Sequence, residues 1–505
     1  MTEQGMTFTS PKVRRTPTRF RHALCKYHLS IGQACDNCGL CVKVCPHGVY
    51  RAGAGRPRVA GEHLCKGPSC RLEEYHCVSR CPQRAITLSP NPSFEVLGDQ
   101  RWTGDLLAST WHMAETGEVP YQDLNHKTGA SGGGFDKLRF LFRQGEGLDL
   151  PDDEMNTAIA LNRLDDGRPR ITLPVPFYLA GMSYGSISIV AMLSRVRAAA
   201  AWGTFCCTGE GGYPDELKPY DDHVITQVAT GLFGVREETI KRVRIVEFKY
   251  AQGAKPGLGG HLLGDKVTPQ VARMREAVAG SALFSPFPFH SVYSVEDHKK
   301  HVDWIKEINP RALVAIKVST PTDADMVAVG SYFAGAHIIQ LDGSYGGTGA
   351  APDIAKKNIA MPIEYAVPKV HRFLTEEGIR DKVTLIASGG IRTAQDMAKI
   401  IALGANGVSL GTADMVALEC IRCHNCESGR GCARGIATTD EKLTGLMQLD
   451  WGAHRIVNMY TAWMCQFKAI LKRLGMRDVN ELVGRWDTLV HLDYVQKEAR
   501  EGELD

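Results

Sequence analysis

The sequence has no long hydrophobic run and little excess of charge. None of its 505 residues lies in a stretch of the roughly 18 consecutive apolar residues that a membrane helix needs. Residues 1–10 lack the apolar core of a secretory signal. The 59 basic and 56 acidic side chains leave a net charge of +3, which offers no broad electrostatic footprint for nucleic acid or an anionic membrane. We therefore expect a cytoplasmic protein with neither kind of partner.

Two further signals are missing. No repeats or low-complexity tracts stand out, and no Gly-x-Gly-x-x-Gly unit stands between a strand and a helix. The sequence therefore carries no nicotinamide-binding fingerprint of its own. Its length exceeds the usual size of one hydrophobic core, which predicts one large domain accompanied by smaller modules.

Cysteine, in contrast, is plentiful and clustered. Twelve of the sixteen cysteines fall into three tight groups. In a large chain without a secretory signal, such groups favour metal binding over disulfides. The other four are scattered, and burial as small apolar side chains accounts for them: Cys25, Cys206, Cys207 and Cys465. The pair at 206–207 lies near a predicted active-site loop, which leaves a functional role open.

The first two cysteine groups follow one another in the N-terminal part. The first reads Cys35-x2-Cys38-x2-Cys41-x3-Cys45-Pro46, a bacterial ferredoxin run in which the fourth thiolate reaches a second cluster. The second reads Cys65-x4-Cys70-x6-Cys77-x3-Cys81-Pro82, with a standard ending and enlarged earlier loops. Crossed ligation predicts two 4Fe–4S clusters, one on Cys35, Cys38, Cys41 and Cys81, the other on Cys45, Cys65, Cys70 and Cys77. Structural zinc is the alternative, which the two Cys-Pro endings disfavour.

Residues 171–415 repeat a short β-branched run, a polar or glycine-rich turn and a helical stretch. This βα rhythm predicts an α/β protein built on a closed (β/α)8 barrel, with a small α+β ferredoxin-like domain before it. The eight expected strands are Phe177–Met182, Thr204–Cys207, Val243–Lys249, Ala282–Phe284, Leu313–Val318, His337–Leu341, Val383–Ala387 and Gly407–Leu410.

Glycine turns follow the last two expected strands. Ser388-Gly389-Gly390 and Gly411-Thr412 offer backbone N–H groups where barrels usually bind a cofactor phosphate. This pair predicts FMN. Lys317 ends the fifth expected strand, where an ammonium would stabilise an anionic reduced flavin from its pyrimidine end.

The third cysteine group comes directly after the last expected strand, as Cys420-x2-Cys423-x2-Cys426-x5-Cys432. Thiolates at this density suit iron–sulfur or zinc. A cluster at the rim of a flavin barrel would carry electrons from the ferredoxin-like segment to the flavin, which favours iron. We expect a 4Fe–4S cluster here, with 3Fe–4S as the alternative.

Six segments of the barrel region resemble the FMN-binding synthase domain of glutamate synthase, in the short form with a ferredoxin-like segment described in archaea and many bacteria. The segment at 252–260, Gln-Gly-Ala-Lys-Pro-Gly-Leu-Gly-Gly, is the most specific. The other five are 181–188, 208–212, 343–350, 387–392 and 435–438.

The resemblance implies a reaction. In this family 2-oxoglutarate and ammonia form 2-iminoglutarate, which reduced FMN converts to L-glutamate. Lys249, Lys255 and Arg275 match positions that hold the two carboxylates. Gln252 would bind the keto or imino group, and Glu210 would handle a proton or receive ammonia.

The remaining site residues are also implied by the resemblance. The catalytic set is Glu210, Lys249, Gln252 and Lys255, and the substrate set adds Gly259, Gly260 and Arg275. The expected FMN contacts are Met182, Ser183, Gly185, Gln252, Lys317, Asp342, Gly343, Gly346, Gly347, Thr348, Ser388, Gly389, Gly390, Gly411 and Thr412.

The sequence departs from the family pattern in two ways. The loop at 285–291 reads Ser-Pro-Phe-Pro-Phe-His-Ser, so one of the usual paired histidines and the aspartate after them are missing, which bears on ammonia access. The amidotransferase cysteine and glycine-repeat β-helix of the long enzymes are also missing. We therefore expect separate amidotransferase and β-helix subunits or the use of free ammonia, an electron donor that is either ferredoxin or an NAD(P)H-oxidising subunit, and an oligomeric assembly.

The expected organisation has five parts: an arm (1–30), a ferredoxin-like domain (31–90), a connector leading into the barrel (91–170), the FMN barrel (171–415), and a cysteine segment with a helical tail (416–505). Two other functions stay open. One is an N-methylglutamate synthase-type subunit that uses methylamine. The other is a non-catalytic electron relay, which the dicarboxylate-binding residues disfavour.

Overall fold

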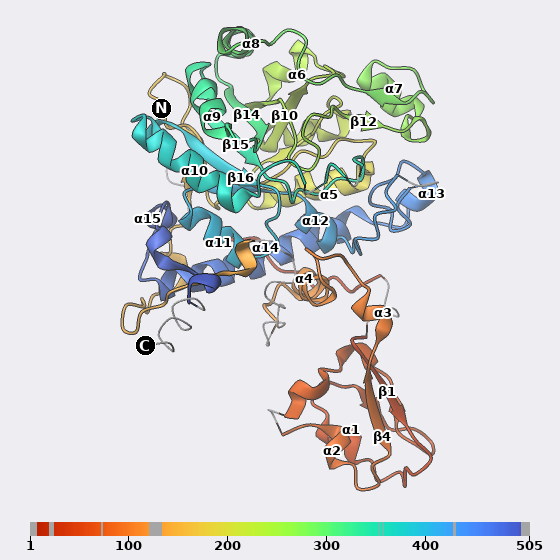
Figure 1. The fold of residues 1–505 in the computed structure, drawn as a ribbon. Helices are drawn as coiled ribbons and strands as arrows, with labels where there is room; N and C mark the ends of the chain where they lie inside the picture. The colour runs from red at the N-terminus through yellow and green to blue at the C-terminus, as the bar shows by residue number, and fades with distance from the viewer. Residues whose placement is uncertain are drawn as a thin grey trace. The chain divides into compact units, whose positions relative to one another are not determined.

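The computed structural model describes residues 8–19, 25–71, 74–120, 134–352, 354–356, 358–427 and 431–495. They form two compact units, of which the smaller is mostly red to orange in Figure 1 and the larger mostly yellow to blue. The smaller unit holds Pro17–Ala108 and Ile421–Cys423, and the larger unit holds the rest of the described chain. No helix in the described ranges is long and apolar enough to cross a membrane.

The smaller unit is built on two antiparallel strand pairs. β1 (Tyr27–Ile31) pairs with β4 (Ile86–Pro90), and β2 (Tyr50–Arg51) pairs with β3 (Arg58–Val59). Four buried apolar residues form a core cluster beside these strands, and five of the clustered cysteines pack against them. A core this small is typical of modules that metal–thiolate bonds help to hold. Its helical elements are α1 (Leu40–Val44), η1 (Glu62–Leu64), η2 (Gly67–Arg71), α2 (Cys77–Arg80) and α3 (Pro92–Glu95).

The larger unit is a closed barrel of eight parallel strands, which confirms the predicted fold class. Each strand is followed in the chain by a loop or helix that returns to the start of the next, as in other (β/α)8 barrels. The strands in barrel order are β8 (Phe177–Leu179), β9 (Cys206–Cys207), β10 (Val224–Ala229), β11 (Ile245–Lys249), β14 (Leu313–Ser319), β15 (Ile338–Asp342), β16 (Thr384–Ser388) and β17 (Gly407–Leu410).

One expected barrel strand is wrong. Leu283–Phe284 forms β13, which pairs antiparallel with β12 (His261–Leu262) outside the barrel. The third barrel strand is instead β10, which the sequence did not reveal. All six β10 residues are buried, and its Thr226 and Gln227 interrupt the apolar run. Val243–Lys249 therefore contains the fourth strand, and the segment at 252–260 follows the fourth strand.

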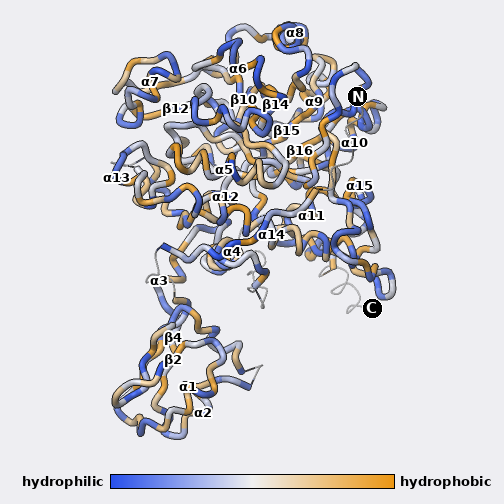
Figure 2. Tube along the Cα trace, turned by 180° about the vertical axis from the view of Figure 1, so that it is seen from behind, coloured by the Kyte–Doolittle hydropathy of each residue, from blue (hydrophilic) through white to orange (hydrophobic). Residues whose placement is uncertain are grey.

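Helices surround the barrel, and several begin at a serine or threonine whose side chain caps the first turn, such as Ser188, Ser294 and Thr393. Hydrophobic colour follows the barrel interior in Figure 2, and hydrophilic colour lies mostly on the outer turns. The helices of this unit and its border are α4 (Gly104–Thr116), α5 (Ile189–Ala201), α6 (Glu237–Arg242), α7 (Pro269–Arg275), α8 (Val295–Ile308), α9 (Ala324–Phe333), α10 (Ile363–Glu376), α11 (Ala394–Ala402), α12 (Thr412–Ala417), α13 (Glu441–Thr444), α14 (Leu449–Arg473) and α15 (Val479–Leu482).

The long helix α14 joins distant parts of this unit. It packs against α5 and α11, and its Asn458 exchanges hydrogen bonds with the backbone of Arg14. Arg455 donates to the Thr16 carbonyl oxygen. The N-terminal arm is therefore tied to the barrel unit. Short pairs complete it: β5 (Leu138–Phe140) with β18 (Leu489–His491), and β6 (Ile159–Ala160) with β7 (Thr172–Leu173).

Candidate active site and cofactor sites

The carboxyl ends of β9 and β11 bring an acid and a base together. Glu210 follows β9, and Lys249 is the last residue of β11. Their Oε2 and Nζ atoms lie 3.3 Å apart, with side chains only 10% and 13% exposed. The two residues stand on either side of β10, so the order of the strands in the barrel brings together side chains that are 39 residues apart in the sequence.

The loop after β11 closes one side of this pair. Lys255 is buried, and its ammonium donates to the Gly259 carbonyl oxygen at 3.0 Å. A Cβ on Gly260 would lie 2.3 Å from Glu210 Oε1, so only glycine lets this backbone approach the carboxylate. From beyond β13, the Ser285 hydroxyl donates to the same oxygen. The predicted residues Glu210, Lys249, Lys255, Gly259 and Gly260 thus lie together.

The charges in this pocket shift one another. Burial alone would raise the pKa of Glu210, but Lys249 and the Ser285 hydroxyl bring it below its ordinary value. Burial and the neighbouring Lys249 lower the pKa of Lys255 to about 8. At neutral pH the pocket therefore holds the ionised carboxylate of Glu210 and the ammonium of Lys255.

Arg275 lies at the end of α7 and is buried. It donates to the Ser183 hydroxyl at 3.0 Å and to the Tyr184 carbonyl oxygen at 2.9 Å. Burial lowers its pKa to about 10. Its side chain also lies against Gly211, one residue from Glu210, where a Cβ would meet the guanidinium at 2.5 Å. Arg275 therefore connects the loops after β8 and β9.

A second polar cluster occupies the ends of β14, β15 and β16. Lys317 Nζ lies 3.5 Å from Asp342 Oδ2. That carboxylate also accepts bonds from the Gly253 backbone N–H at 3.0 Å and the Ser388 hydroxyl at 2.7 Å. Burial opposes the charge of Lys317, but Asp342 and Glu247 raise its pKa above the ordinary value.

Glycines allow three backbone segments to touch beside this cluster. A Cβ on Gly253 would lie 2.1 Å from the Asp342 carbonyl oxygen. Gly389, at φ +88°, would place one 2.4 Å from the Gly343 oxygen. Gly411 begins α12 without a side-chain cap, and Met182 lies next to it. The backbone N–H groups of these glycine segments and of the first turn of α12 form a set of donors that fits the phosphate of FMN.

Other expected flavin residues occupy the same loops. Gly346 donates to the Gly343 oxygen at 3.1 Å, Gly347 is exposed, and the Thr348 hydroxyl accepts from Ala350 N. Gly185 has a positive φ of 103° beside Leu262. Gln252 starts the turn in which its carbonyl oxygen accepts from Lys255 N at 3.1 Å. Thr412 is the first residue of α12.

The neighbouring Arg392 has a structural role. Its guanidinium pairs with Asp136 at 2.7 Å and with Asp396 at 2.9 Å, and all three are largely shielded from water. It therefore fixes the start of α11 to the segment before β5.

The barrel interior holds a carboxylate that sequence reasoning missed. Glu247 is fully buried on β11, and its Oε1 accepts from Gln227 Nε2 at 2.6 Å. Its Oε2 is buried without a hydrogen-bond partner among the described residues. Burial raises its pKa, and Lys317 opposes the rise. The sequence offered one sign of this residue: Glu247 lies two residues before Lys249, and alternate residues of a strand point to the same face.

The first eight clustered cysteines line two cavities in the smaller unit. One cavity is lined by Cys35, Cys38, Cys41, Cys77 and Cys81, and the other by Cys45, Cys65, Cys70 and Cys77. None of these thiols forms a disulfide. Cavities lined by several free thiols fit iron–sulfur clusters. The Tyr50 hydroxyl lies 3.0 Å from Cys77 Sγ.

The third cysteine group is divided between the units. Cys423 belongs to the smaller unit, and Cys420, Cys426 and Cys432 belong to the larger. The Cys426 carbonyl oxygen accepts from Lys266 Nζ at 2.7 Å. A Cβ added to Gly349 would lie 2.8 Å from the Cβ of Cys426, so this cysteine packs against the loop after β15.

Residues 136–477 match the family described as "Conserved region in glutamate synthase", and residues 33–51 match "4Fe-4S binding domain". The chain belongs to the glutamate synthase family. As a member of that family it is a flavin- and iron–sulfur-dependent oxidoreductase, as the sequence predicted. FMN and an iron–sulfur cluster are the cofactors that the family match supports.

Two curated members of the glutamate synthase family match almost the whole chain, and a third matches about two thirds of it. It is 37% identical over 477 residues to the archaeal-type glutamate synthase (NADPH) of Thermotoga maritima, covering 90% of this chain and 92% of that one. It is 35% identical over 510 residues to the archaeal glutamate synthase (NADPH) of Methanocaldococcus jannaschii, covering 94% and 96%. The glutamate synthase (NADPH) large chain of Azospirillum brasilense is 36% identical over 342 residues, which is 65% of this chain and 22% of that one.

Proposed function

We propose that this glutamate synthase chain converts 2-oxoglutarate and ammonia to L-glutamate at the carboxyl end of the barrel. The observation that carries the proposal is the shielded pocket in which Lys249 and Lys255 face Glu210 beside bare glycine backbone. A substrate with two carboxylates needs cations, and a partly dry site strengthens their attraction. Reduced FMN, when bound, supplies the two electrons for the reduction.

The chain's own residues bind the substrate and handle protons. Lys255 is the main carboxylate ligand, because its hydrogen-bond partner among the described residues is a neutral carbonyl oxygen. Lys249 and Arg275 add positive charge from either side of Glu210, and Gln252 orients the keto or imino group. Glu210 is held ionised, so it accepts a proton as the amine adds and returns it when water leaves. Gly259 and Gly260 keep this side of the pocket free of side chains.

The FMN site lies along the loops after β8 and β14 to β17. Lys317 and Asp342 form a buried pair that sets the charge near the flavin ring, supported by Ser388. Backbone groups at Gly389, Gly390, Gly411 and Thr412 hold the phosphate. The rest of the site comprises Met182, Ser183, Gly185, Gln252, Gly343, Gly346, Gly347 and Thr348.

Three clusters carry electrons to the flavin. Cys35, Cys38, Cys41 and Cys81 hold the first 4Fe–4S cluster, and Cys45, Cys65, Cys70 and Cys77 hold the second; the two thiol-lined cavities support this division. Cys420, Cys423, Cys426 and Cys432 hold the third, for which four ligands favour 4Fe–4S over 3Fe–4S. The packing of Cys426 against Gly349 supports a route into the barrel loops.

Partners complete the reaction. Ammonia reaches the pocket from a separate amidotransferase subunit, in an oligomer that includes a β-helix subunit, or as free ammonia. Electrons come from ferredoxin or an NAD(P)H-oxidising subunit, because the sequence has no dinucleotide-binding unit of its own.

Isotope labelling tests the reaction. The anaerobic enzyme is photoreduced and mixed with 2-oxoglutarate and ¹⁵N-ammonium or methylamine, and the products are identified by mass spectrometry. We expect at least one ¹⁵N-glutamate per reduced flavin, because reduced clusters can pass further electrons to the flavin, and none from the Glu210→Gln variant on the same timescale. N-methylglutamate as the only product, or no amino acid from either amine, would contradict the proposal.

A further inference from the structure

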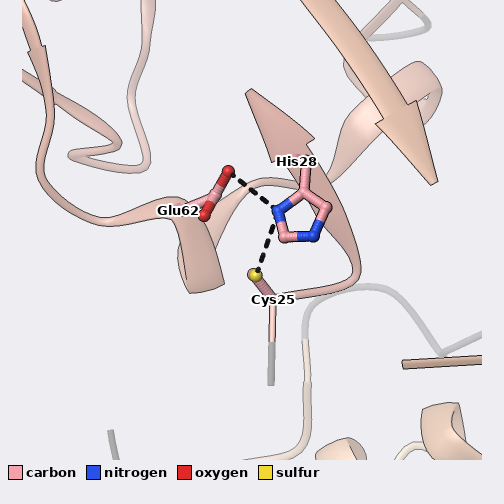
Figure 3. A group of neighbouring side chains, drawn as sticks. All are labelled: Cys25, His28 and Glu62. Atoms are coloured by element: carbon pink, nitrogen blue, oxygen red, sulfur yellow. Dashed lines mark hydrogen bonds and ion pairs between the residues drawn. The ribbon is translucent and has the colours of Figure 1, made fainter. Parts of the chain in front are cut away.

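Three side chains of the smaller unit converge outside the clustered cysteines. Figure 3 shows their side chains pointing toward one another. His28 Nδ1 lies 4.0 Å from Cys25 Sγ and 3.5 Å from Glu62 Oε1. The three donor atoms all lie within 4.8 Å of one another. Cys25 and His28 have a Cys-x2-His spacing at the start of β1, and Glu62 is the first residue of η1.

The chemistry of these donors fits one small divalent ion. Zinc binds thiolate sulfur at about 2.3 Å, imidazole nitrogen at about 2.0–2.1 Å and carboxylate oxygen at about 2.0–2.2 Å. Tetrahedral coordination at those lengths puts neighbouring ligand atoms about 3.5 Å apart. The separations of 4.0 and 3.5 Å therefore need to change by only a few tenths of an ångström. A mixed sulfur, nitrogen and oxygen set also distinguishes this group from the thiolate sets of the iron–sulfur clusters.

Three hydrogen bonds from outside the group orient Cys25 and Glu62. Asn91 Nδ2 donates to Cys25 Sγ at 3.3 Å and to the Cys25 carbonyl oxygen at 2.7 Å. The Leu29 backbone N–H donates to Glu62 Oε1 at 2.6 Å. Contacts of this kind hold metal ligands in place and contribute to metal affinity. The Asn91 amide and the Leu29 N–H thus hold the thiol and the carboxylate from outside the group of three.

We propose that Cys25, His28 and Glu62 bind one zinc ion, with water as the fourth ligand. The His28 side chain is 53% exposed, which leaves room for that water. The ion joins β1 to η1. Cys65 follows η1 directly, and its N–H donates to the Glu62 carbonyl oxygen at 3.0 Å. Zinc binding therefore stiffens the segment that presents the first cysteine of the second group.

Metal analysis of the full-length, iron-loaded protein tests the site. After anaerobic purification with zinc supplied, we expect one zinc per chain. X-ray absorption at the zinc edge should show one sulfur at about 2.3 Å and three lighter ligands at about 2.0–2.1 Å. Cys25→Ser and Glu62→Gln should lose the zinc and keep the iron and the FMN. Asn91→Asp keeps the side-chain oxygen that caps α3 but removes the N–H group that donates to Cys25 Sγ. This variant should bind zinc about 10–100-fold more weakly.

His63→Ala is the matched control, because His63 is exposed on the same turn as Glu62. It should retain the zinc. Wild-type protein without zinc, or zinc that persists in Cys25→Ser, would overturn the proposal. So would a shell of four sulfur atoms, since zinc would then occupy a cluster site.

Discussion

Glu210 and Lys249 form an ion pair with a separation of 3.3 Å across 39 residues of sequence. Both side chains are largely shielded from water, so little solvent screens the attraction between them. Lys249 already has this carboxylate as its partner, whereas Lys255 donates to the neutral Gly259 oxygen. The two lysines therefore have different roles: Lys249 holds Glu210 ionised, and Lys255 is available for a substrate carboxylate.

Replacing Lys255 by alanine should weaken 2-oxoglutarate binding about ten- to hundredfold. A charge-assisted hydrogen bond in a partly dry pocket contributes about 1.5–3 kcal/mol. Titration of the oxidised enzyme, followed through the flavin spectrum, measures the loss. Lys218→Ala removes an exposed lysine as a control and should bind normally. Binding by Lys255→Ala within about twofold of wild type would contradict this role.

The same lysine should give 2-oxoglutarate binding a basic limb. Its pKa is about 8 in the free enzyme, and only the protonated form pairs with a carboxylate. Binding should therefore be constant below that pH and weaken about tenfold for each further pH unit. In Lys255→Arg the limb should move up beyond about pH 10, because a guanidinium stays protonated. Dissociation constants measured from about pH 6 to 10 check both statements. If binding to Lys255→Arg weakens over the same pH range as binding to wild type, the basic limb belongs to another group.

Ser285→Ala should raise the pKa of Glu210. Its hydroxyl donates to the carboxylate and favours the ionised form, so its loss should shift the acid limb of turnover up by about one unit, or roughly 1.4 kcal/mol. The rate at neutral pH should fall much less than the rate at acid pH, because Glu210 stays ionised at neutral pH in the variant as well. Ser291→Ala, at the far end of the same loop, is the control. An acid limb that does not move would show that the hydroxyl contributes little to the charge of Glu210.

Gly253→Ala should impair FMN binding. The new Cβ would lie 2.1 Å from the Asp342 oxygen, so the loop after β11 must move away from Asp342 and Gly343. We expect the variant to lose most of its flavin on gel filtration while retaining its iron. Gly147→Ala has only an ordinary contact with the Lys472 oxygen at 3.7 Å and should keep both cofactors. Normal flavin content in Gly253→Ala would contradict the placement of the flavin site.

Sequence reasoning reached the barrel because strand ends and glycine turns recur at regular intervals. It failed at β10, where Thr226 and Gln227 interrupt the apolar run although every strand residue is buried. In the sequence alone, polar side chains that face the interior of a barrel cannot be distinguished from the polar residues of a turn. The run at 282–284 looked like a barrel strand because a two-residue hairpin arm and a short buried strand have the same local pattern.

The candidate site was predictable to a similar extent. Glu210 and Lys255 could be named because they lie in motifs that match a family. Ser285 and Glu247 act through contacts that only the folded chain creates, since Ser285 reaches Glu210 from a loop 75 residues later. Glu247 is buried with Gln227 from the neighbouring strand. No local pattern encodes these pairings.

Single-turnover mixing tests the central claim most directly. Photoreduced enzyme is mixed with 2-oxoglutarate and ammonia, and flavin absorbance is followed in wild type and Glu210→Gln. We predict rapid reoxidation in wild type and a rate about 10²–10⁴ lower in the variant, with FMN and iron content unchanged. If 2-oxoglutarate with ammonia does not reoxidise the wild-type flavin, or if the variant reacts at the wild-type rate, the account of this site is wrong.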